Sequence, residues 1–121
     1  MNINAVGVVV PLAADGELLR VVVEGFEEAG LSIKNNGPNA FDQFEVWVKH
    51  HKDGPEVRLA TLAADYSTPL WPLRRTVGTP VTLANGVSAS LFLNVAGIHT
   101  LILKGSAATG AGTCDIQGQV T

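Results

Sequence analysis

Residues 31–48 contain the pattern that most restricts how this chain can fold. A short apolar run leads into the turn Asn35-Asn36-Gly37-Pro38-Asn39, and an alternating segment follows the turn. On one side of that segment lie Phe44, Val46 and Val48, and on the other lie Gln43, Glu45, Trp47 and Lys49. Alternation with a period of two predicts a β-strand with one buried face. Trp47 is the exception, a large aromatic residue on the polar side.

The same pattern of strand and turn continues along the rest of the chain. Gly, Pro, Asn and Asp recur at short, fairly even intervals, and Asn85-Gly86 is a strong hairpin signal. The runs between them predict strands near residues 5–10, 18–24, 31–34, 41–50, 57–62, 80–83, 88–95, 98–104 and 113–120. Because no helical crossovers separate these runs, we predict one all-β domain over residues 1–121. The expected architecture is an antiparallel β-sandwich or jelly roll of about eight short strands.

One segment also fits a helix. The apolar residues of 18–26 fit one helical face, with Asp15 as an N-cap and Gly30 as a C-terminal stop. The Val21-Val22-Val23 triplet and Gly25 lower helix propensity. We therefore predict a strand here, followed by a turn from Gly25 to Gly30.

Composition limits the class of partner. The 121 residues carry a formal charge of −3 with a pI near 5.5, so nucleic acid is not an expected partner. Charged residues make up 16% of the chain, against about 25% in ordinary soluble domains. A surface this poor in charge is common in proteins that pack against copies of themselves or a larger assembly. A weakly charged monomer is the alternative.

The single cysteine and the apolar runs indicate where the chain is made. Cys114 excludes an intramolecular disulfide and lies on the apolar side of an alternating run, so we expect a small buried residue there. The N-terminus lacks the positive region of a signal peptide, and no run approaches the ~18 apolar residues of a membrane span. The expectation is a soluble protein made in the cytosol, with no membrane partner.

No grouping of residues indicates catalysis. His50 and His51 are adjacent, so in a strand their imidazoles point to opposite faces and do not converge on one metal ion. Glu24, Glu27 and Glu28 crowd a turn, but without the alternating ligand spacing of a calcium loop. Nucleophile, phosphate-loop and dinucleotide motifs are also missing from the sequence. We therefore predict no enzyme, no metal and no cofactor.

Aromatic and arginine side chains indicate a contact surface instead. Trp47 lies on a polar strand face, Phe92 points away from the apolar side of its own strand, and residues 66–75 form a long irregular segment. Such residue types are enriched in the energetic centres of interfaces. The alternative is that this segment covers an open end of its own sandwich. The candidate contact residues are Trp47, Tyr66, Leu70, Trp71, Arg74 and Arg75.

The arrangement from residue 31 onward resembles a known class of proteins. The strand-turn-strand of residues 31–46, the turn Lys52-Asp53-Gly54, the run 98–105, the small-residue turn 106–112 and the final Gly118-Gln119-Val120-Thr121 carry the resemblance. They are similar to small accessory β-sandwich virion proteins of tailed bacteriophages. This class includes capsid decoration or cement proteins and minor tail or head-fibre components.

The resemblance implies a structural role on the virion. It implies a decoration or cement protein that is made in the host cytoplasm, forms a homo-oligomer, with a trimer as the expected order, and binds the major capsid protein at the outer surface of the head shell. A minor tail or head-fibre component is the alternative within the class. A carbohydrate- or receptor-binding module is the alternative outside it, with Trp47 or Trp71 as the sugar platform.

Overall fold

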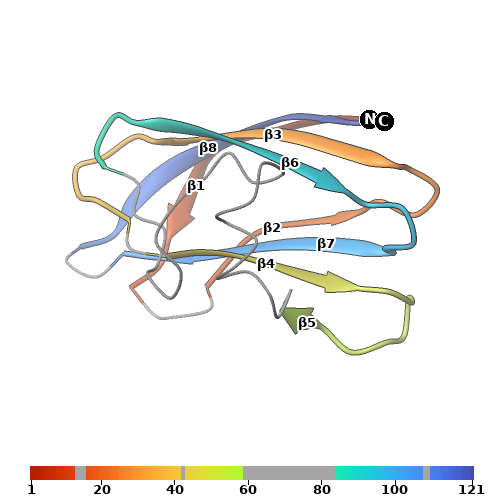
Figure 1. Cartoon of the computed structure of the whole chain (residues 1–121). Coiled ribbons are helices and arrows are strands. Elements are labelled where there is room, and N and C mark those ends of the chain that lie inside the picture. The colour runs from red at the N-terminus through yellow and green to blue at the C-terminus, as the bar shows by residue number, and fades with distance from the viewer. Residues whose placement is uncertain (13–15, 42, 59–83, 108–109) are drawn as a thin grey trace, which may run out of the picture.

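Two antiparallel sheets form the body of the protein. The computed structural model describes residues 1–12, 16–41, 43–58, 84–107 and 110–121. These residues form no helix and eight strands: β1 (Asn2–Val10), β2 (Gly16–Val22), β3 (Glu28–Asn35), β4 (Gln43–Lys49), β5 (Val57–Arg58), β6 (Ser88–Asn94), β7 (Thr100–Ser106) and β8 (Gly112–Val120). The first sheet has the order β1-β8-β3-β6 and the second sheet β2-β7-β4-β5. The sheets lie face to face as two layers (Figure 1), which confirms the predicted all-β sandwich.

Alternating side chains fill the space between the two sheets. In β3, residues Leu31 and Ile33 are buried while Ser32 and Lys34 are exposed, as the period of two requires. Cys114 is fully buried in this core, where loss of solvation raises the pKa of its thiol to about 11. The expectation of a small buried residue at Cys114 is therefore confirmed. Other core side chains come from both sheets and include Val10, Val46, Val48, Leu91, Leu101, Leu103, Ile116 and Val120.

The predicted strand at residues 18–24 is confirmed, but the predicted turn after it is too long. β2 ends at Val22, and Gly25 adopts a positive φ of 85° in the turn that follows. β3 then begins at Glu28, so Gly30 lies inside a strand. Gly30 pairs with Phe92 on β6 and Gln119 on β8. The prediction of a turn reaching Gly30 was wrong because pairing on both sides overrides the low strand propensity of glycine.

The predictions for residues 57–62 and 80–86 are described by the structure only in part. Asn85-Gly86 forms the expected turn, with Gly86 at φ 77° and the Val87 amide donating to the Ala84 carbonyl at 3.0 Å. The strand predicted at 80–83 lies outside the described residues. Of the strand predicted at 57–62, the structure describes only β5 and its two residues.

A buried amide organises the turn after β3. Asn35 is fully buried; its Nδ2 donates to the Asn39 carbonyl at 2.8 Å, and its Oδ1 accepts from the Gly37 amide at 2.6 Å. Its main chain also bonds to Val87 and Gly86 in the second turn. Asn35 therefore links the two turns at this end of the sandwich, with its side chain bonded within the first turn and its main chain bonded to the second.

The carboxylate of Asp115 stabilises a break in the regular pairing of β1 with β8. The register of β1 against β8 shifts between Ala5 and Val8, and Gly7 there has a φ of 67°. Its amide donates to Asp115 Oδ1 at 2.9 Å, and Asn36 Nδ2 donates to the same oxygen at 2.9 Å. The bonds from Gly7 and Asn36 hold the pKa of the Asp115 carboxyl below its usual value.

Replacing the buried amide should destabilise the fold. Asn35→Ala leaves the Gly37 amide and the Asn39 carbonyl without this partner in a buried setting, so we expect the free energy of unfolding to fall by about 2–3 kcal/mol. Urea denaturation measures the change. The control is Asn2→Ala, an exposed amide, which should stay within about 0.5 kcal/mol of the parent. Equal midpoints for the two variants would contradict this role for Asn35.

Protonation of Asp115 should contribute to the loss of stability at acid pH. The pKa of Asp115 in the folded protein lies below the ordinary 3.8. The stability that its carboxylate contributes is therefore fully present above pH 3.8 and is lost as the pH falls through the folded pKa. We expect the urea midpoint to drop less between pH 7 and pH 3 in Asp115→Asn than in the parent, because asparagine does not titrate. Parallel pH profiles for the two proteins would show that Asp115 does not contribute.

Candidate functional site

The outer faces of the two sheets differ in chemistry. The outer side of the second sheet, here named the charged face, carries Glu17, Arg20, Glu45, Trp47, Glu56, Arg58 and Lys104. The outer side of the first sheet, here named the amide face, carries Asn2, Asn4, Ser32, Ser88, Ser90, Phe92, Asn94, Gln117 and Gln119. Among the strand residues that the structure describes, most of the outward charged groups therefore belong to the second sheet, and the first sheet adds Glu28, Lys34 and Asp115.

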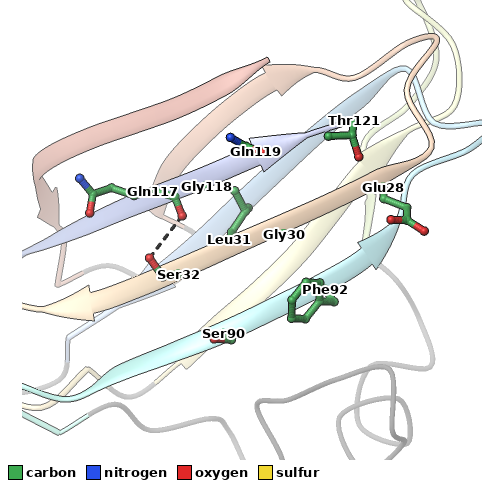
Figure 2. Close-up of a pocket in the computed structure, with 10 residues that line it drawn as sticks. All are labelled: Glu28, Gly30, Leu31, Ser32, Ser90, Phe92, Gln117, Gly118, Gln119 and Thr121. Atoms are coloured by element: carbon green, nitrogen blue, oxygen red, sulfur yellow. Dashed lines mark hydrogen bonds between the residues drawn. The ribbon is translucent and has the colours of Figure 1, made fainter.

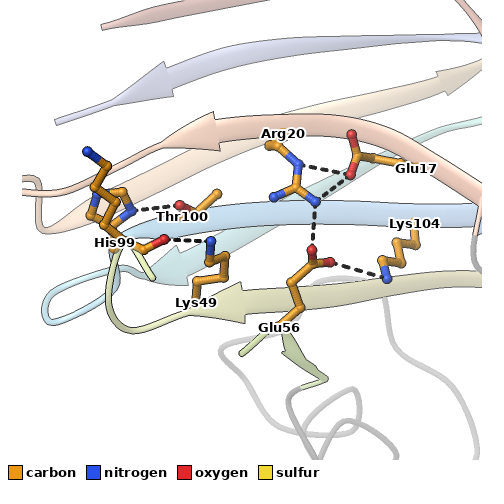
Figure 3. Close-up of polar contacts among 8 residues, drawn as sticks. Glu17, Arg20, Lys49, Glu56, His99, Thr100 and Lys104 are labelled. Atoms are coloured by element: carbon orange, nitrogen blue, oxygen red, sulfur yellow. Dashed lines mark hydrogen bonds and ion pairs between the residues drawn. The ribbon is translucent and has the colours of Figure 1, made fainter. Parts of the chain in front are cut away.

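Ion pairs on the charged face link two strands, β2 and β7, through the segment before β5. Figure 3 shows Arg20 between two carboxylates, with Nη2 at 2.8 Å from Glu17 and 2.9 Å from Glu56. Lys104 lies 3.6 Å from the other oxygen of Glu56. The hydrogen bond from Arg20 lowers the pKa of Glu56. Glu17, Arg20 and Glu56 are exposed, whereas Lys104 is mostly covered. The exposed pairs contribute little to stability, and the network mainly fixes side-chain positions.

Trp47 is partly covered by the charged face. It pairs in register with Ile102 of β7, which is fully buried although it lies on the outer side of the sheet. Lys104 Nζ lies 3.9 Å from the centre of the Trp47 ring, a cation–π contact. The indole Nε1 donates to Glu45 at 3.2 Å. The aromatic residue that stood out in the sequence thus covers an apolar residue of its own sheet and keeps part of its surface exposed.

Of the six candidate contact residues, the structure describes one. Trp47 is placed on β4 at the centre of the charged face. The remaining five follow β5 along the chain and lie outside the described residues: Tyr66, Leu70, Trp71, Arg74 and Arg75. Their predicted contact role stays a prediction, as does that of Trp47.

The histidines bond separately to nearby groups. His50 Nδ1 lies 3.2 Å from the Gly97 carbonyl, and His51 Nδ1 accepts from the Asp53 amide at 3.2 Å. Across the described residues, His, Cys, Asp and Glu side chains form no group of three or more that could hold a metal ion. The part of the chain that the structure describes also contains no apolar helix of the length needed to cross a bilayer.

The amide face contains a shallow hollow that the sequence analysis missed. Its volume is about 480 Å³, and Gly30 and Gly118 of neighbouring strands form part of its floor (Figure 2). A Cβ at Gly118 would collide with the Gly30 carbonyl oxygen, so only glycine fits there. Phe92, which is 62% exposed, lies beside Gly30. The outward position of Phe92 and the alternation Gln117-Gly118-Gln119 were the available sequence signals.

Truncating Trp47 should weaken the second sheet. Trp47→Ala removes the cover from Ile102 and the ring from Lys104, so we expect a loss of about 2 kcal/mol in unfolding free energy. Trp47→Phe keeps an aromatic face and should lose less than about 1 kcal/mol. Chemical denaturation followed by circular dichroism gives both values. If both variants match the exposed control Val22→Ala, the packing role of Trp47 is refuted.

Comparison with known proteins finds a solved structure with a similar fold. No protein-family model and no curated protein matches the chain. Among solved structures, the crystal structure of the SPBc2 prophage-derived protein YomS is similar, with a TM-score of 0.50 and 15% sequence identity. The match covers 100% of this chain and 96% of that one. The two proteins therefore share a β-sandwich fold over essentially their full lengths.

Proposed function

We propose that this protein is a structural component of a tailed-phage virion, a capsid decoration or cement protein that binds and stabilises the head shell. The observation that carries the proposal is the full-length likeness of its fold to a prophage-derived protein. The resemblance seen from residue 31 onward leads to the same class. Neither distinguishes head from tail, so the test below compares both.

The body of the protein suits a role that needs rigidity and contact area. Both chain ends are bonded into the first sheet: the Met1 amino group donates to the Val120 carbonyl at 2.8 Å, and the amides of Glu27 and Glu28 donate to the Thr121 carbonyl. The ends lie side by side in Figure 1. These bonds tie the first and last strands into the same sheet. Resistance to local unfolding is an advantage for a protein held on an exposed shell.

The charged face provides the contact surface in this proposal. Trp47 lies at its centre, next to Arg58 of β5, and the segment with Tyr66, Trp71 and Arg74 follows β5 in the sequence. Tryptophan, tyrosine and arginine are the residue types that dominate interface energies. The proposed partners are the major capsid protein and further copies of this chain, as a trimer. Many copies on a repeating shell would add weak contacts into high avidity.

Shell binding tests the proposal directly. Purified protein is mixed with heads, and separately with tails, of the encoding phage from which this gene has been deleted, and pelleted material is measured. We expect saturable binding to heads and a higher temperature of head rupture. Binding to tails only would replace the decoration role with a tail role. Binding to neither would refute a virion role.

A pair of variants tests whether the segment after β5 makes the contact. Arg74→Ala removes a candidate on the segment after β5, and Lys34→Ala removes a cation from the outer side of the opposite sheet. We expect Arg74→Ala to weaken head binding at least about tenfold, the range of an interface arginine, and Lys34→Ala to leave it unchanged. Equal affinities would exclude Arg74 from the contact.

Light scattering should give a mass near three times 12.6 kDa for the trimer.

A further inference from the structure

The hollow on the amide face consists of a polar rim around one aromatic ring. Its lining residues are Glu28, Gly30, Leu31, Ser32, Ser90, Phe92, Gln117, Gly118, Gln119 and Thr121. The Phe92 ring covers Gly30 so closely that a Cβ there would lie 3.1 Å from Cε1 and 3.4 Å from Cδ1. The strand backbone therefore supports the ring from beneath, and the ring remains 62% exposed. Figure 2 shows the hydroxyl and amide groups on the strands around it.

Several polar groups around the ring are available to a ligand. The side chains of Gln119 and Ser90 make no hydrogen bond to any residue that the structure describes. Gln117 is oriented by its bond from Nε2 to Asn4 at 2.7 Å, and Ser32 by its bond to the Gln117 carbonyl at 3.3 Å. Oriented amides and hydroxyls both donate and accept hydrogen bonds. They can therefore bind hydroxyl groups in either role.

The charges around the hollow restrict the class of ligand. Among the lining residues, none is cationic and one, Glu28, is a carboxylate. Lys34 lies farther along β3, opposite Asp115 of β8. A phosphate, a sulfate or an acidic polymer would find a carboxylate and no counter-charge here. The lining therefore disfavours anions and fits a neutral ligand with many hydroxyl groups.

We propose that this hollow binds a neutral saccharide, with a pyranose ring stacked on Phe92 and its hydroxyl groups bonded by Gln119, Ser90 and Thr121. The C–H face of a pyranose is apolar and slightly positive, which suits the negative face of an aromatic ring. Its outward hydroxyl groups match the surrounding amides. The site lies on the sheet opposite the charged face and does not depend on the proposed role in the virion.

A partner protein fits this face less well than a saccharide does. The centre of a stable protein interface is mostly apolar and contains several aromatic or aliphatic side chains. Around the hollow, Phe92 is surrounded by serine, threonine, glutamine and one glutamate, with Gly30 beneath the ring. Such a surface remains well hydrated, and exchanging water for sugar hydroxyl groups preserves its hydrogen bonds.

Titration of the isotope-labelled protein by NMR tests the site. The probes are cellohexaose and maltohexaose as neutral saccharides, with a heparin hexasaccharide as the anionic comparison. We expect a neutral probe to shift the amide signals of Gly30, Ser32, Gln117 and Gln119, with a Kd on the order of 1 mM for one shallow ring site. If neither neutral probe shifts these signals, or if only heparin does, the proposal is overturned.

Three variants identify the groups responsible. Phe92→Ala should raise the Kd at least about tenfold, and Gly30→Ala, which displaces the ring, should raise it as well. The control Val22→Ala removes an equally exposed apolar side chain from the other sheet and should change nothing. Unchanged binding in a folded Phe92→Ala protein would overturn the proposal. So would a change of its mass in light scattering, because this face would then be the contact between copies of the chain. Head binding is measured separately, so failure of one proposal does not imply failure of the other.

Discussion

The pairing of β8 between β1 and β3 is the constraint on which the rest of the structure depends. It joins the last strand of the chain to the first, with Asn2 opposite Gln119, and it brings Gly118 against Gly30. The approach is so close that any side chain at Gly118 would meet the Gly30 carbonyl oxygen. Gly30 itself lies in an outward position between Phe92 and Gln119, so the amide face has no side chain at that point of the hollow.

The two outer faces give this sandwich two separate surfaces. On the charged face, the ionic groups and Trp47 bond largely to one another, and Ile102 is fully buried next to Trp47. On the amide face, hydroxyl and amide side chains and the carboxylate of Glu28 surround the exposed ring of Phe92. A sandwich can separate its surfaces in this way because outward positions on each sheet do not contact the shared core. The proposed shell partner and the proposed neutral ligand would therefore use different surfaces and would not compete.

The local sequence pattern was sufficient to predict those features that depend on strand periodicity or turn residues within a few positions. The alternation around Val46 and Val48, the turn at Asn85-Gly86 and the burial of Cys114 were all predictable for this reason. Gly30 was misread as part of a turn because its strand position depends on Phe92 and Gln119, which are distant in the sequence. The full set of bonds to Asn35 was likewise out of reach, since they join two turns about 50 residues apart.

The sequence by itself determined the fold class, because hydrophobic period and turn residues encode strands locally and a chain of this length must bury one face of each. It also identified Trp47 and Phe92 as aromatics on outward faces. Only the tertiary structure decided what those two residues do: Trp47 covers Ile102 beneath Lys104, and Phe92 lies on a glycine of the next strand. The reason is that strand order and register set which outward side chains become neighbours, and both depend on pairings between distant segments.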